Sequence, residues 1–116
     1  MKRTSLALIL LASTGTAVGQ SPGGFHGPSG VRVSTAAEIP GLPDDSHVQV
    51  TGYLVRSLGG DEYEFQDDTG TLIVEIDDDQ WGGIEADPAT RLQLTGELDI
   101  DPDKVELEVE RVALAP

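Results

Sequence analysis

Cysteine is absent from this chain of 116 residues, so the fold contains no disulfide and no lipid can be attached at a cysteine. Basic residues are also scarce, with 7 Lys and Arg against 21 Asp and Glu. Such a surface repels phosphate backbones, because affinity for nucleic acid comes largely from Lys and Arg that displace counterions. The composition therefore argues against nucleic-acid partners and favours cationic ones.

The chain also lacks an apolar run long enough to span a bilayer. The run from Leu6 to Ala12 ends in small and polar residues, well short of the roughly 20 apolar residues that a span requires. It follows Lys2 and Arg3 and precedes the small residues Ala17-Val18-Gly19, the pattern of a cleavable signal peptide over residues 1–19. We therefore expect export with no membrane span after cleavage; a retained anchor is the alternative.

Cleavage before Gln20 removes two basic residues and leaves five against 21 acidic ones, a net charge of −16. The remaining length suits one domain with a modest core. Two interpretations of the charge stay open: an anionic surface for a cationic ligand, or an adaptation that keeps the protein soluble in strong salt.

What is present from residue 20 onward divides into a lead and a domain. Residues 20–33 are rich in Gly, Pro and Ser and predict a flexible lead. Residues 34–116 predict one domain. It begins with a helical turn at Thr35 to Ile39, because Thr35 and Glu38 form a capping-box pattern.

The rest of the domain alternates apolar and polar residues with period two, which predicts strands. Turn signals divide it into five strands, and the apolar parity slips near Glu110 and Arg111, which predicts a β-bulge. The fold class is therefore all-β with one short helix, and a five-stranded OB-fold barrel is the first choice. Periodicity alone also permits another small barrel or a sandwich.

Several segments support the OB topology by resemblance. They are Val50-Thr51-Gly52-Tyr53, Phe65-Gln66-Asp67-Asp68-Thr69-Gly70, Val74-Glu75-Ile76-Asp77-Asp78-Asp79 with Trp81, and Leu94-Thr95-Gly96-Glu97. Over roughly residues 35–114 the chain resembles the bacterial OB-fold (BOF) family of small periplasmic stress-tolerance proteins. The resemblance implies a signal peptide, an OB barrel, periplasmic residence, a role in stress tolerance, and no enzymatic activity. It supplies no binding residues.

The first candidate site lies after the third strand. Asp77, Asp78 and Asp79 offer carboxylates to a hard cation, although aspartates there can equally cap a turn. Trp81 follows, and it would either plug a barrel end or stack on a sugar ring. Tyr63 and Phe65 have the spacing of core residues.

The second candidate site lies around the last hairpin. Asp99, Asp101 and Asp103 resemble part of a calcium loop, but Lys104 stands where the loop needs glycine. We therefore expect no tightly held cofactor; a weak divalent-cation site, such as one for calcium, and a solvated acidic turn remain alternatives. Glu106, Glu108 and Glu110 should face outward beside Glu75 and Asp77, as an anionic binding face or as a merely solvated one, and two of them, Glu106 and Glu108, are the candidate ligand-binding residues of this strand.

No catalytic constellation is recognisable. His26 and His47 have no serine, cysteine or second histidine at a catalytic spacing. We expect a non-enzymatic periplasmic binding module of envelope stress tolerance, with a cationic peptide, a polyamine or a peptidoglycan fragment as ligand. The alternative is a structural or interaction protein of the envelope, with an envelope protein as partner and no small ligand.

Overall fold

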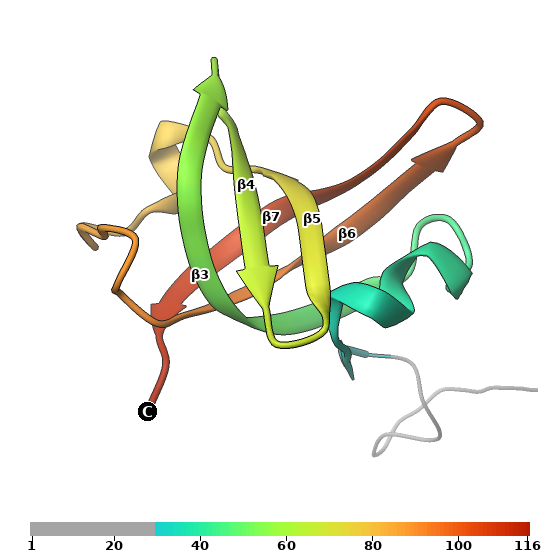
Figure 1. The fold of residues 1–116 in the computed structure, drawn as a ribbon, viewed down its shortest axis with the longest axis horizontal. Helices are drawn as coiled ribbons and strands as arrows, with labels where there is room; N and C mark the ends of the chain where they lie inside the picture. Colours follow the sequence, from blue (N-terminus) through green and yellow to red (C-terminus); the bar gives the residue numbers. More distant parts are fainter. Residues whose placement is uncertain (1–29) are drawn as a thin grey trace, which may run out of the picture.

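The computed structural model describes residues 30–116. The expected signal peptide and most of the expected lead lie outside the described residues. Strands β3 (His47–Gly59), β4 (Glu62–Asp67), β5 (Gly70–Glu75), β7 (Lys104–Leu114) and β6 (Leu92–Asp101) are hydrogen-bonded in that order. Pairing of β3 with β6 closes the ring, so the five predicted strands and the OB-fold barrel are confirmed (Figure 1).

A sixth, very short strand was not expected. β2 (Arg32–Val33) pairs in parallel with Val48 and Gln49 of β3. The last two residues of the segment expected to be a flexible lead are therefore strand.

The barrel interior holds the alternating apolar residues. Its fully buried members include Val48, Val50, Phe65, Val74 and Leu107. Burial of such side chains is the main stabilising contribution in a fold without disulfides. The long β6–β7 hairpin extends past the other strands, toward the side of the molecule where η3 lies (Figure 1).

The short 3-10 helix η3 (Ala36–Gly41) covers part of this core with Ala36 and Ile39. The predicted capping box of Thr35 and Glu38 is present, and Pro40 lies inside the last turn rather than after it. The β4–β5 turn holds the helix start: Asp67 Oδ2 accepts a hydrogen bond from the Ala36 N–H at 2.9 Å. A second 3-10 segment, η4 (Asp78–Gln80), was not predicted as helix.

The predicted bulge in the last strand is confirmed. Thr95 pairs with Arg111 and Gly96 pairs with Val109, which leaves Glu110 as the extra residue. Two further irregularities in β3, next to Leu54 and Ser57, had no signal in the apolar pattern. Among residues 30–116 no helix has the length and apolar character needed to cross a bilayer.

Candidate functional site

Four glutamates form a row across the outer face of the barrel. Glu62 is the direct cross-strand partner of Glu75, Glu75 is that of Glu108, and Glu108 is that of Glu97. Neighbouring strands lie about 4.8 Å apart, so this glutamate row places four carboxylates within about 15 Å. His47, the partner of Glu97 on β3, stands at its end.

Most of the glutamate row has no cation beside it. Only Glu62 forms an ion pair, with Lys104 Nζ at 2.6 Å from its Oε2; none of the ion pairs found within residues 30–116 includes Glu75, Glu97 or Glu108. Partial burial raises the pKa of Glu108, and the charges of Asp99, Glu75 and Glu97 raise it further. The row is therefore a region of concentrated negative potential.

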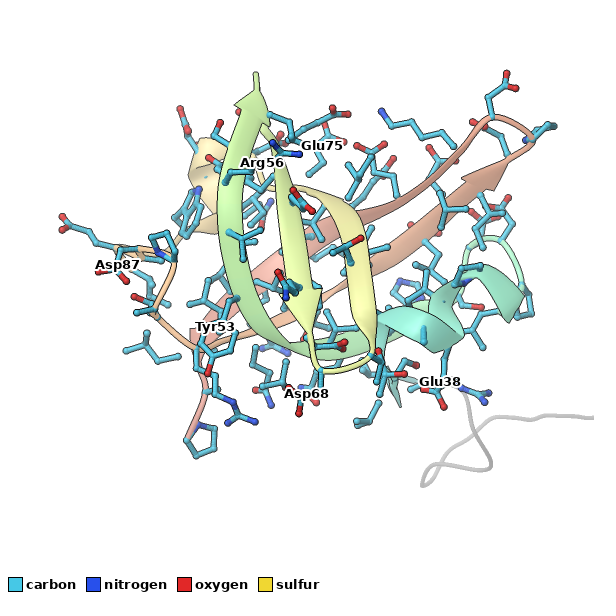
Figure 2. All side chains as sticks on the ribbon, in the orientation of Figure 1. Glu38, Tyr53, Arg56, Asp68, Glu75 and Asp87 are labelled. Carbon is cyan, nitrogen blue, oxygen red and sulfur yellow. The ribbon has the colours of Figure 1, made fainter. Side chains whose placement is uncertain are left out.

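A small hollow of about 150 Å³ opens beside the row. Glu75, Asp77, Glu108, Val109 and Glu110 line it, so it brings together two candidate binding residues, Asp77 and Glu108. Figure 2 shows Glu75 at the end of β5 opposite the Asp68 turn. The hollow can admit a cationic group, and its volume lies below the roughly 300–1,000 Å³ of pockets that enclose a drug-sized ligand.

The three aspartates of the first candidate site lie in two different places. Asp77 lies within ligand distance of Asp61 and Glu75, with one carboxylate oxygen of each within 4.8 Å of the others. Partial burial and a hydrogen bond to Asp77 raise the pKa of Asp61. Asp78 and Asp79 form the exposed first turn of η4, and the Asp77 side chain makes no capping hydrogen bond. Only one of the three aspartates therefore joins the acidic hollow.

Glu106 corrects the expectation that the glutamates of β7 share one exposed face. Its residue is only 7% exposed, and its Oε2 atom is buried without a hydrogen-bond partner. Lys104 Nζ lies 3.6 Å from Oε1 of Glu106 and 2.6 Å from Glu62. Burial, together with hydrogen bonding to Glu62, raises the pKa of Glu106 to about 7. The hydrogen bond from Lys104 lowers the pKa of Glu62, so a proton shared by the two glutamates resides mainly on Glu106.

The tip of the β6–β7 hairpin is a tight turn and has none of the geometry of an EF-hand loop. Asp101 pairs with Lys104, and Asp101 Oδ1 accepts a hydrogen bond from the Asp103 N–H at 3.0 Å. Asp99 lies on β6 opposite Glu106. The two groupings of three acidic or histidine ligands found within residues 30–116 lie elsewhere and include none of Asp99, Asp101 and Asp103.

Trp81 lies at a second surface, away from the hollow. It packs edge-on against Tyr63, with ring centroids 5.8 Å apart and an interplanar angle of 82°. Both rings are partly buried, and both line a pocket of about 480 Å³ with Leu54, Arg56, Ser57, Ile84, Glu85, Ala86, Asp87 and Pro88. Phe65 is fully buried, as predicted, whereas Tyr63 is only partly so. Trp81 thus contacts the core and also offers a ring surface to a ligand.

The sequence did not reveal the row as a unit. Glu62, Glu97 and His47 were not singled out as binding residues, because they lie on three strands far apart in the chain. Knowledge of the OB strand order with the register would have revealed them, since the row follows directly from cross-strand pairing.

Comparison with known proteins agrees with this architecture. Residues 12–114 match the family model described as bacterial OB fold (BOF) protein. Protein YgiW of Escherichia coli is 35% identical over 97% of this chain and 96% of its own length. The calcium-regulated OB-fold protein CarO of Pseudomonas aeruginosa is 39% identical over 77% of this chain and 78% of its own.

Solved structures lead to the same family. The structure of YgiW from E. coli superposes with a TM-score of 0.71 at 36% identity, covering 81% of this chain and all of that one. Replication protein A of U. maydis bound to ssDNA superposes with a TM-score of 0.55, over 77% of this chain and 76% of that one, but at 12% identity this likeness extends to the fold alone. By sequence and structure together, the chain belongs to the bacterial OB-fold (BOF) family.

Proposed function

We propose that this protein is a periplasmic, non-enzymatic binding module of envelope stress tolerance, and that its glutamate row binds a cationic ligand such as a polyamine or a cationic peptide. The observation that carries the proposal is the row itself: four carboxylates in cross-strand register, of which only Glu62 has a basic partner within residues 30–116.

The row suits a ligand with several positive charges. Like charges directly opposite each other destabilise a strand pair by several tenths of a kcal/mol, and a bound cation relieves that repulsion. At 0.1 M salt the Debye length is about 10 Å, longer than the spacing of adjacent strands, so neighbouring carboxylates still interact. A polyamine presents ammonium groups spaced by short alkyl chains and can contact several carboxylates at once. Calcium is the simpler candidate, and one relative is named for its regulation by calcium.

The proposed periplasmic location and the proposed lack of enzymatic activity are supported by different observations. The basic start, the short apolar run and Ala17-Val18-Gly19 favour export. The family and the relative CarO are named for an OB fold, and neither these names nor that of YgiW refers to a reaction, which favours a binding module. Fractionation of cells producing the untagged protein tests the location: we expect it in the periplasmic extract with its first 19 residues removed, and recovery in the cytoplasm at full length would contradict this.

Calorimetry tests the ligand. We expect spermine to bind the protein and to bind the Glu75→Gln/Glu108→Gln variant at least about tenfold more weakly, with a loss of affinity as salt rises. The matched control is Asp68→Asn/Glu85→Gln, which removes the same charge from exposed residues outside the row. Equal weakening in both variants would show that net charge alone is responsible, and no binding of spermine, calcium or a cationic peptide would overturn the proposal.

A peptidoglycan fragment is the second candidate ligand, favoured by a different observation. The Trp81–Tyr63 pocket of about 480 Å³ has aromatic surface together with Arg56, Glu85 and Asp87, the mixture used to bind a sugar with an attached peptide. Titration of Trp81 fluorescence with a muropeptide tests it, since Trp81 is the chain's single tryptophan. Trp81→Ala should abolish binding, as measured by calorimetry, and leave spermine binding intact.

The structural alternative predicts a different salt response. If the acidic surface serves only solubility in salt, with an envelope protein as the partner, sodium chloride should raise the melting temperature as much as calcium at equal ionic strength. A calcium effect that exceeds the sodium effect, and that is lost in Glu75→Gln/Glu108→Gln, favours the binding module.

A further inference from the structure

We propose a transition-metal site, built to take Zn²⁺, from His47, Glu97 and Glu110. Nε2 or Nδ1 of His47 and one carboxylate oxygen of each glutamate lie within 4.8 Å of one another. His47 Nε2 is 3.8 Å from Oε2 of Glu110. Each ligand comes from a different strand of the closed barrel: β3, β6 and β7.

The backbone positions two of these residues by pairing and the third by the bulge. His47 and Glu97 are direct cross-strand partners, so their side chains share the outer face. Glu110 is the extra residue of the β7 bulge, and both it and Arg111 are exposed in succession. Bulges re-aim a side chain in this way, and here the bulge turns a carboxylate toward a histidine two strands away.

A missing side chain lets β7 approach β6 at this point. A Cβ on Gly96 would lie 2.1 Å from the backbone oxygen of Glu108, so any larger residue would push the two strands apart. Gly96 thereby fixes the separation of the strands that carry Glu97 and Glu110.

The ligand set distinguishes this site from the purely acidic row. Imidazole nitrogen with carboxylate oxygen is a donor set of Zn²⁺, whereas Ca²⁺ takes oxygen ligands. Zinc with three protein ligands keeps its fourth position for water. Ligand atoms around tetrahedral zinc lie about 3.4 Å apart, so small rotations of the exposed His47 and Glu110 side chains complete the geometry. Two glutamate charges then balance the ion.

This inference goes beyond the cationic-ligand proposal. Glu97 belongs to both sites, Glu110 also lines the hollow beside the glutamate row, and His47 belongs to neither the row nor the hollow. His47 and Glu110 are therefore the residues to change. His26, the chain's other histidine, supplies a matched control because it offers the same imidazole and is not one of the three proposed ligands.

The test is calorimetric titration of the untagged protein with Zn²⁺, followed by NMR of the histidine side chains. We expect one zinc ion per chain, perturbation of the His47 ring signals, and affinity at least about tenfold weaker in His47→Ala and in Glu110→Gln. His26→Ala should bind as the parent does, and Ca²⁺ should not shift the His47 signals. Circular dichroism without metal checks that the variants fold.

Three results would overturn the proposal: no zinc binding by the parent, equal weakening in His26→Ala and His47→Ala, or unchanged affinity in Glu110→Gln. Spermine binding should persist in His47→Ala. Glu75→Gln/Glu108→Gln should show the reverse, with weak spermine binding and zinc binding retained. The two variants together therefore show which of the two proposals fails.

Discussion

Two neighbouring rows on the outer face of the barrel contain similar acidic residues but differ in how far their negative charges are neutralised. The glutamate row contains four carboxylates and one basic partner, Lys104 on Glu62. The next row contains Glu64, Ile73, Glu106 and Asp99 in register. There Arg56 pairs with Glu64 at 2.6 Å, and Ile73 separates the two glutamates.

Glu106 completes the contrast. It is buried and has a pKa of about 7, so near neutral pH it carries a proton for part of the time. The second row therefore reduces its repulsion with a salt bridge, an apolar residue and a proton, all supplied without a ligand. The glutamate row keeps its repulsion, and this difference is why we assign ligand binding to the first row and pH sensitivity to the second.

The largest expected effect comes from Gly96→Ala, which disturbs both rows at once. Its new Cβ would clash with the backbone of Glu108, so β6 and β7 must separate. We expect a loss of about 3 kcal/mol in the free energy of unfolding, at the upper end of the usual range because the clash is with backbone atoms, measured by urea denaturation. Gly41→Ala is the control, because a Cβ there meets nothing within 4 Å. A loss of stability no larger than that of Gly41→Ala would show that β6 and β7 accommodate the new Cβ without cost.

The next effect isolates the second row through pH. Because the pKa of Glu106 is raised in the folded state, its contribution to stability is fully present below about pH 4.5 and is lost as pH rises through about 7. Glu106→Gln should therefore raise the free energy of unfolding on the order of 2 kcal/mol at pH 8 and little at pH 5.

Urea denaturation at the two pH values measures this difference. Glu64→Gln is the matched control, because it changes a glutamate of the same row that is only partly buried and forms an ion pair with Arg56. An equal effect of Glu106→Gln at both pH values would contradict the proposed role of the shared proton.

The smallest expected effect isolates the glutamate row through salt. Glu75→Gln/Glu108→Gln should stabilise the protein by several tenths of a kcal/mol at low ionic strength, because it removes charges that face each other across β5 and β7. Thermal melts in sodium chloride from about 20 mM to about 1 M measure this, because screening becomes strong over that range. The melting temperature of the double variant should rise less with salt than that of the parent. A rise as large as that of the parent would show that the repulsion lies elsewhere.

Much of the fold could be predicted because its signals are local. The apolar alternation predicted the strands, and Thr35 and Glu38 predicted the helical turn. The slip in parity placed the bulge near Glu110 or Arg111, and Glu110 is the extra residue. The placement of Glu75 beside the last strand also holds, in register with Glu108.

The candidate site could be predicted only in part, because it depends on the register between strands and on which side chains their neighbours bury. Parity places Glu106 on the outer face correctly, but it does not show that neighbouring side chains bury it. His47 stood alone in the sequence, and only the closure of β3 onto β6 brings it to Glu97. The aspartates of the last hairpin have part of the spacing of a calcium loop. Strand pairing instead places Asp99 opposite Glu106 and Asp101 opposite Lys104.

The origin of the glutamate row on four separate strands has a consequence for how a ligand would affect the protein. The charges of the glutamate row come from four strands, so the pattern exists only while β4, β5, β7 and β6 are paired, and an unfolded chain offers nothing equivalent. A ligand that spans the row binds the folded state selectively and adds its binding free energy to the free energy of unfolding. The amount of surviving protein would then report the supply of that ligand, with no conformational switch required.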